Sequence, residues 1–124
     1  MARILIVEDA KYVGEMIREM LESNGHEIAG VASNGAEAIV KYKALKPNLV
    51  LMDILMPVMD GISAIKKIME QDPKARIIVV TAVGKESIRK ESIKAGALYV
   101  VTKPFEAKQL LDAVSAATSG QGKG

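Results

Sequence analysis

"LVLMDILMPVMDG", residues 49–61, joins a short run of branched aliphatic residues to a carboxylate, Asp53. Residues 49–52 have the length and composition of a strand that is covered on both faces. Pro57 and Gly61 interrupt the chain close behind this strand. A buried strand that ends on a charge predicts that Asp53 is held rigidly at the edge of a sheet.

Four further apolar runs resemble this strand: "ILIV" (4–7), "IAGVA" (28–32), "IIVV" (77–80) and "LYVV" (98–101). Between the runs the apolar residues take helical spacing, and after the first run they form one stripe: Val13, Met16, Ile17, Met20 and Leu21. Strands that alternate with helices predict an α/β fold, because parallel strands need right-handed crossovers between them. We therefore expect a doubly wound sheet of five parallel strands with five helices.

The predicted helices differ in how their ends and inner faces are marked. Gly25 ends the first helix, and Asn34 followed by Glu37 predicts an N-cap for the second. The segment "GKESIRKESIKAGA" (84–97) has no apolar stripe and predicts a helix with little burial that shifts easily. We expect the second helix to turn three apolar side chains inward: Ala36, Ile39 and Val40.

The composition describes one domain. A chain of 124 residues with 49% hydrophobic residues builds one core, and we expect a domain over residues 1–118 and a disordered polar tail over 119–124. The absence of Cys excludes a disulfide scaffold and a thiolate metal site and favours a reducing compartment. No apolar run approaches the ~20 residues that cross a bilayer, so we expect a cytoplasmic protein without membrane insertion.

The charge is small but unevenly distributed. A net charge of +2 gives no reason to expect nucleic acid as a partner. From residue 81 onward, seven Lys and Arg residues stand against four Asp and Glu residues, so the last third of the chain is its basic part. The single histidine, His26, cannot form a metal cluster alone, and we interpret it as a surface residue near a turn.

Polar side chains stand where four of the predicted strands end. Glu8 and Asp9 follow the first strand, Asp53 follows the third, Thr81 ends the fourth, and Lys103 closely follows the fifth. Taken singly, each has a structural explanation, such as a helix-start acid, a loop cap, a β-branched strand residue or a solvated charge. Ligands of open parallel sheets bind beyond the carboxyl ends of the strands, however, and all five residues fall there. The pattern therefore predicts a site at this edge.

Three carboxylates at one site repel one another, so that one takes a proton or a cation lies among them. Oxygen ligands with room for water suit Mg²⁺. Together with an ammonium group, such a cation neutralises the charge of an incoming phosphoryl group, and in-line transfer to a carboxylate needs little else. These residues favour phosphoryl transfer to an aspartate.

Four motifs together resemble the receiver domain of two-component response regulators, in the single-domain form of the chemotaxis regulators: "ILIVED" (4–9), "LVLMDILMPVMDG" (49–61), "VVTA" (79–82) and "VTKPF" (101–105). The resemblance covers residues 3 to about 117 and implies a flavodoxin-like sheet in the order 2-1-3-4-5. It also implies a monomeric, phosphorylation-activated switch that is not an enzyme and catalyses only its own phosphorylation and dephosphorylation.

The resemblance implies a role for each residue around the phosphoacceptor. Asp53 accepts a phosphoryl group from the phosphohistidine of a histidine kinase, while Glu8, Asp9, Asp53 and the backbone carbonyl of Leu55 arrange Mg²⁺. The family often has Asp at the position of Glu8, so we expect a slightly changed metal geometry. Leu55 and Val83 occupy the positions that tune the lifetime of the phosphorylated state, and both are apolar.

Further residues would respond to phosphorylation. By the same resemblance, Lys103 contacts the phosphate from a loop with a cis peptide before Pro104, Thr81 hydrogen-bonds the phosphoryl group, and Tyr99 turns inward afterwards. A downstream target protein would bind the face of the fourth helix, fifth strand and fifth helix. This face is basic and carries Lys85, Arg89, Lys90, Lys94 and Lys108.

Other functions fit parts of the pattern. A Mg²⁺-dependent phosphohydrolase acting through an aspartyl-phosphate would want a second acid two residues after Asp53, where Leu55 stands. A flavin or nucleotide binder needs a Gly- or Ser/Thr-rich phosphate loop after the first strand, where "VEDAKYVG" (7–14) offers acids. An intermediate of a phosphorelay would use the same residues as a chemotaxis regulator, so the sequence leaves the output open.

Overall fold

Strands and helices alternate along the whole of the computed structural model, which describes residues 1–119. The strands are β1 (Arg3–Val7), β2 (Glu27–Ala32), β3 (Leu49–Met52), β4 (Ile77–Thr81) and β5 (Tyr99–Thr102). The helices are α1 (Lys11–Glu22), α2 (Gly35–Leu45), α3 (Gly61–Gln71), α4 (Glu86–Ala95) and α5 (Ala107–Ser119). The strands pair in parallel in the order β2-β1-β3-β4-β5, which confirms the predicted sheet.

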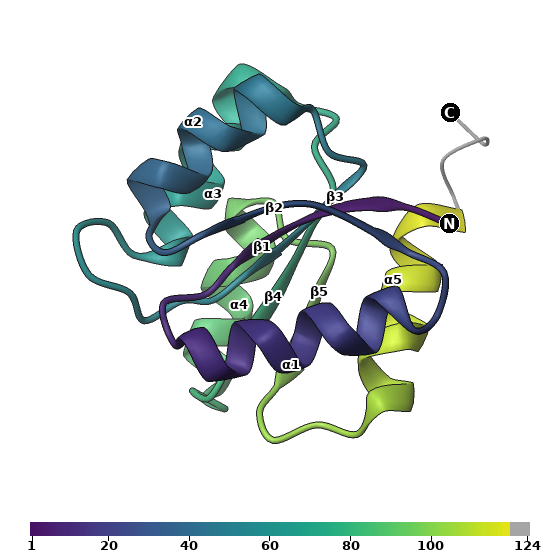
Figure 1. The fold of residues 1–124 in the computed structure, drawn as a ribbon. Coiled ribbons are helices and arrows are strands. Elements are labelled where there is room, and N and C mark those ends of the chain that lie inside the picture. The colour runs from purple at the N-terminus through teal and green to yellow at the C-terminus, as the bar shows by residue number, and fades with distance from the viewer. Residues whose placement is uncertain (120–124) are drawn as a thin grey trace.

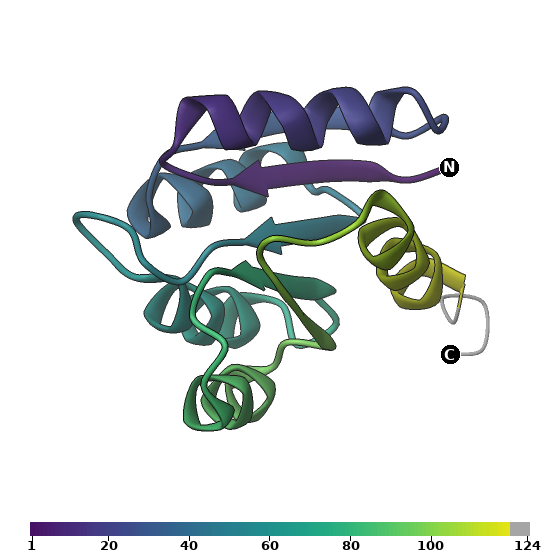
Figure 2. The same ribbon diagram turned by 90° about the horizontal axis from the view of Figure 1, so that it is seen from below.

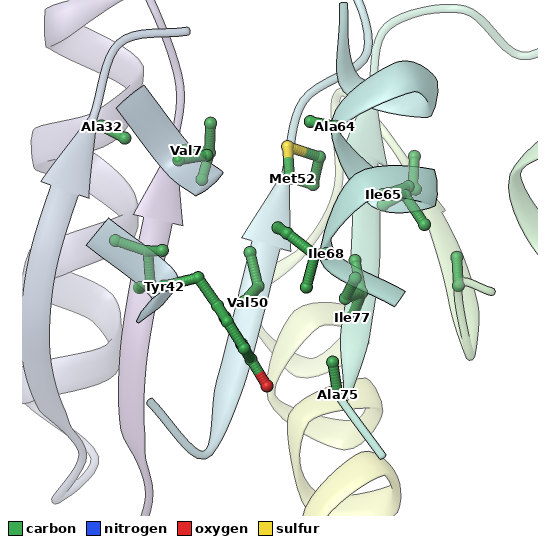
Figure 3. Close-up of a cluster of buried hydrophobic side chains, with 14 of the residues drawn as sticks. Val7, Ala32, Tyr42, Val50, Met52, Ala64, Ile65, Ile68, Ala75 and Ile77 are labelled. Carbon is green, nitrogen blue, oxygen red and sulfur yellow. The ribbon is translucent and has the colours of Figure 1, made fainter. Parts of the chain in front are cut away.

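Helices cover both faces of the sheet (Figure 1). Successive residues of a strand face opposite cores, so Ile4 and Ile6 pack under α1 and α5, while Leu5 and Val7 pack under α2 and α3. Burial on both sides explains why the strands read as continuous apolar runs. Figure 3 shows the core on the α2 and α3 side, which includes Val50, Met52, Ile65, Ile68 and Ile77.

The N-cap predicted for α2 is confirmed, but its predicted inner face is partly wrong. Asn34 Oδ1 accepts the Glu37 N–H at 2.9 Å. Val40, expected to point inward, is 68% exposed, and the buried face is formed by Ala38 and Tyr42. The Tyr42 ring, labelled in Figure 3, can be buried because its hydroxyl donates to Asp72 Oδ2 at 2.6 Å.

α4 is anchored least of the helices, as the sequence predicts. Ser92 is its single buried residue, and the Ser92 hydroxyl donates to the Ile88 carbonyl at 2.7 Å. Ile93, one of its few large apolar residues, is 40% exposed. The helix packs against α3 and β5, and its Ile88 and Ala95 are partly buried against the core.

The ends of α1 and α5 lie close to their predicted positions. α1 ends at Glu22, and Gly25, with φ +87°, lies in the turn beyond its C-cap Ser23. α5 includes Ser119, one residue past the predicted end of the domain, and residues 120–124 of the predicted tail lie outside the described residues. Over residues 1–119, no helix has both the length and the apolar character required to span a membrane.

Candidate functional site

The carboxyl ends of the strands lie at one edge of the sheet, and the arrowheads in Figure 2 point toward it. The hydrogen-bond ladder continues one residue past two strands. Asp53 N–H donates to the Val7 carbonyl at 3.0 Å, and Lys103 N–H donates to the Thr81 carbonyl at 2.7 Å. The sheet therefore fixes the backbone of these site residues, which a free loop would not.

The structure brings four predicted site side chains together. Carboxylate oxygens of Glu8, Asp9 and Asp53 lie within 4.8 Å of one another. Lys103 Nζ is 2.6 Å from Glu8 Oε1 and 3.5 Å from Asp53 Oδ2. Glu8 and Asp53 are buried, whereas Asp9 is exposed, so the cluster opens to solvent on one side.

This crowding changes the acidity of the phosphoacceptor candidate. Burial raises the pKa of the Asp53 carboxyl to about 6, and the negative charge of Glu8 adds to the increase. The Lys103 ammonium group and the Ile54 N–H, which donates to Asp53 Oδ1 at 2.7 Å, both lower that pKa without offsetting the increase. The cluster therefore holds more negative charge than its neighbours neutralise.

The donor set fits a hard cation. The three side chains offer carboxylate oxygens only, and the solvent-facing side leaves room for the waters that Mg²⁺ keeps in proteins. A divalent cation would also offset the two causes that raise the pKa of Asp53, which are its burial and the negative charge of Glu8. Glu8, Asp9 and Asp53 are thus able to hold Mg²⁺.

Thr81 and Tyr99 are not part of the cluster: Thr81 ends β4, and Tyr99 opens β5 at the end away from Lys103. Thr81 is fully buried, and its Oγ1 accepts the Val83 N–H at 3.1 Å. Tyr99 pairs with Ile78, three residues before Thr81, and its side chain is 41% exposed. The tyrosine therefore faces outward in this conformation, on the strand next to Thr81.

Two loops complete the rim of the site. The Lys103–Pro104 peptide is cis, in agreement with the resemblance. The loop between β3 and α3 projects beyond the strand ends (Figure 1) and exposes Leu55. In the same loop Val58 has φ +69°, which is strained for a β-branched residue, and Met59 N–H donates to the Pro57 carbonyl at 2.7 Å.

One contact was missed by the sequence analysis, which assigned Glu8 to the metal alone. Both oxygens of Glu8 are engaged, since Oε1 pairs with Lys103 and Oε2 accepts the Ala10 N–H at 3.1 Å. The presence of Glu where Asp is frequent was the available signal, because only the longer side chain reaches both partners.

The predicted target face is exposed and carries more basic than acidic residues, although Glu86, Glu91 and Asp112 are exposed on the same helices. Lys85, Arg89, Lys90 and Lys94 lie on α4 or at its start, and all are exposed. Lys108 on α5 is exposed too, but its ammonium pairs with Asp112 at 2.9 Å. Three large apolar residues of α4, β5 and the turn between them are also exposed: Ile93, Leu98 and Tyr99.

Comparisons with known proteins agree with this geometry. The family model of the response regulator receiver domain matches residues 4–115. The chemotaxis proteins CheY of Thermotoga maritima and Bacillus subtilis are each 48% identical over 113 residues, which are 91% of this chain and 94% of each relative. A chain in the crystal structure of the CheX-CheY-BeF3-Mg+2 complex from Borrelia burgdorferi is 35% identical, with a TM-score of 0.90 over 92% of this chain and 87% of that one.

Proposed function

The chain belongs to the family of response regulator receiver domains, and from this membership we propose a phosphorylation-activated switch that acts in chemotaxis. A histidine kinase supplies the phosphoryl group and Asp53 accepts it. The observation that carries the proposal is a buried aspartate at an open sheet edge, beside two further acids and the Lys103 ammonium group.

Asp53 is the nucleophile. Its Oδ1 is held by the Ile54 N–H, and its Oδ2 lies toward Lys103. An Asp53 oxygen forms a bond to phosphorus while the phosphorus–nitrogen bond of the phosphohistidine breaks, and the electron pair leaves with the imidazole nitrogen. Lys103 offsets the charge on the phosphoryl oxygens. No separate substrate is turned over, so the domain is a switch that catalyses its own modification.

Glu8, Asp9, Asp53 and the Leu55 carbonyl would hold Mg²⁺, which when bound supplies positive charge to the phosphoryl oxygens. The residues themselves position the acceptor and the ammonium group. A divalent cation is therefore required for phosphorylation, and its removal stops the reaction.

The phosphorylated state favours one of two conformations. The Thr81 hydroxyl leaves the Val83 N–H for the phosphoryl group, and Tyr99 turns inward. α4 responds because Ser92 is the single fully buried residue that anchors it. A cytoplasmic target protein with acidic residues then binds the basic face of α4, β5 and α5, and the switch itself is a monomer.

Incubation with acetyl phosphate and Mg²⁺, followed by mass spectrometry, tests the assignment. We expect one added phosphoryl group, none with EDTA, and none in Asp53→Asn. Asp112→Asn, at an exposed position on α5, is the matched control and should label like the wild type. Equal labelling of Asp53→Asn would show that another residue accepts the phosphoryl group.

A further inference from the structure

The ammonium group of Lys103 is closer to Glu8 than to the phosphoacceptor. Its Nζ is 2.6 Å from Glu8 Oε1 but 3.5 Å from Asp53 Oδ2. The first distance is that of a short charge-assisted hydrogen bond, and the second is longer than such a bond. In this conformation Glu8, and not Asp53, is the main partner of Lys103.

Glu8 also connects two loops that the sheet keeps apart. It follows β1 and Lys103 follows β5, while β3 and β4 lie between these two strands. The second oxygen of Glu8 accepts the Ala10 N–H at 3.1 Å, so the carboxylate is fixed from both sides. The side chains are 3% and 19% exposed for Glu8 and Lys103, and water therefore competes little for the pair.

We propose that Glu8 is a positioning residue for Lys103, in addition to its place among the acids that would hold the cation. Its carboxylate keeps the ammonium group beside the site and off Asp53, so that the Asp53 oxygen is free to meet phosphorus. This inference rests on the proposed function, since it assigns Lys103 to the phosphoryl group.

The length of the side chain is the feature on which this role depends. Aspartate at position 8 would keep the charge but shorten the reach by one methylene group, and its carboxylate could not contact Ala10 and Lys103 together. Glutamine would keep the reach and an oxygen acceptor but lose the charge. The two substitutions therefore separate positioning from metal binding.

Titrations with Mg²⁺ alone, and with BeF3− at saturating Mg²⁺, distinguish the two roles. At saturating Mg²⁺, which removes any difference in metal affinity, we expect Glu8→Asp to bind BeF3− at least about tenfold more weakly than the wild type, because ~1 Å of misplacement can cost on the order of 100-fold. Glu8→Gln should bind Mg²⁺ more weakly but BeF3− within about threefold of the wild type. If Glu8 served the metal alone, both variants would bind BeF3− like the wild type at saturating Mg²⁺, and the inference would be overturned.

The NMR signal of the Lys103 side-chain ammonium gives a readout independent of phosphoryl binding. It should persist in the wild type and Glu8→Gln, vanish or shift in Glu8→Asp, and be assigned by its loss in Lys103→Arg. Glu15→Asp, an exposed site on α1, is the matched control and should change neither binding nor this signal. An unchanged ammonium signal in Glu8→Asp contradicts the inference. Failure of the wild type to bind BeF3− would instead contradict the proposed function.

Discussion

The carbonyl group of Asp53 fills the space that a side chain on Gly61 would need. A Cβ atom built on Gly61 would collide with that carbonyl and lie 2.9 Å from the Cα atom of Ile54. The Gly61 N–H donates to the Ile54 carbonyl at 2.9 Å. The first residue of α3 therefore closes directly on the backbone of Asp53, the proposed phosphoacceptor.

Gly61→Ala should lower the free energy of unfolding by about 2–4 kcal/mol, because backbone atoms on both sides must move to admit the methyl group. It should also displace Asp53 and reduce labelling by acetyl phosphate. Gly14→Ala is the control, since a Cβ there would meet only Glu8 side-chain atoms at ordinary distance, 3.9 Å. Urea titrations of both variants test this prediction. Equal unfolding midpoints for Gly61→Ala and Gly14→Ala would show that a Cβ atom at position 61 does not collide with the backbone.

Stability should depend on pH through Asp53. The pKa of its carboxyl is raised to about 6 in the folded protein, from an ordinary value of 3.8. Between these values the native state binds more protons than the unfolded state, so stability falls as pH rises from about 4 to 6. Asp53→Asn removes this loss and should be more stable than the wild type by roughly 1–2 kcal/mol at pH 7, which is the ~3 kcal/mol of the full shift reduced for solvent screening, with no difference near pH 4.

Mg²⁺ should cancel the stability difference between Asp53→Asn and the wild type at pH 7, because a bound cation neutralises the carboxylate cluster. Thermal unfolding with EDTA and with Mg²⁺ measures both effects, and Asp112→Asn serves as a control that responds to neither. If Asp53→Asn were no more stable than the wild type in EDTA at pH 7, the carboxylate cluster would not be a source of repulsion.

The phosphorylated state should be long-lived, because two positions near Asp53 lack polar side chains. Leu55 is 63% exposed and Val83 is half-buried, and neither can orient a water toward phosphorus. Each missing hydrogen bond of roughly 1 kcal/mol slows hydrolysis about fivefold. Leu55→Asn combined with Val83→Glu should therefore accelerate the decay at fixed Mg²⁺, as followed by loss of radiolabel. An unchanged decay rate would mean that these side chains do not set the lifetime.

Hydrogen exchange should locate the response to phosphorylation. α4 has one buried residue, Ser92, and lies beside β5 with the exposed Tyr99. We expect the amides of residues 82–102 to change protection most when BeF3− and Mg²⁺ are added. Changes confined to residues 11–45 would place the switch elsewhere, and Asp53→Asn should show none.

Target binding should weaken as salt rises, since the proposed face is basic. Lys90→Gln on α4 should reduce both the affinity and its salt dependence, whereas Lys43→Gln on the exposed surface of α2 should alter neither. Affinity measured between low and physiological ionic strength checks this. A target whose affinity is indifferent to salt would reject electrostatic attraction as the basis of recognition.

The sheet was predictable because its strands are buried on both faces and read as continuous apolar runs. The inner face of α2 was not, because its stripe contains Val40 together with the smaller Ala38 and the amphipathic Tyr42. Whether valine or tyrosine faces the core is decided by Asp72, a hydrogen-bond partner 30 residues away in the sequence. Contacts over that separation leave no periodic signal.

The convergence of acids at the sheet edge was predictable from the ends of the strands. The side-chain contact partner of each acid was not predictable, because it depends on differences of fractions of an ångström between side chains of different loops. Glu8 reaches Lys103 only through its full length. His26 shows the same limit: it lies near a turn as expected, yet its Nδ1 accepts the Ala2 N–H at 3.1 Å, and burial lowers its pKa.

The limited burial of α4 has a consequence for how the targets of such domains can diversify in evolution. Mutations on its outer surface disturb little core packing, because the proposed reaction centre is built on strand ends and α4 is held from below by Ser92, Ile88 and Ala95. The target protein that the domain recognises can thus change in evolution while the proposed phosphoryl-transfer chemistry stays the same. Duplicated copies within one cell would need only a few substitutions on this surface to bind different target proteins and so avoid cross-talk.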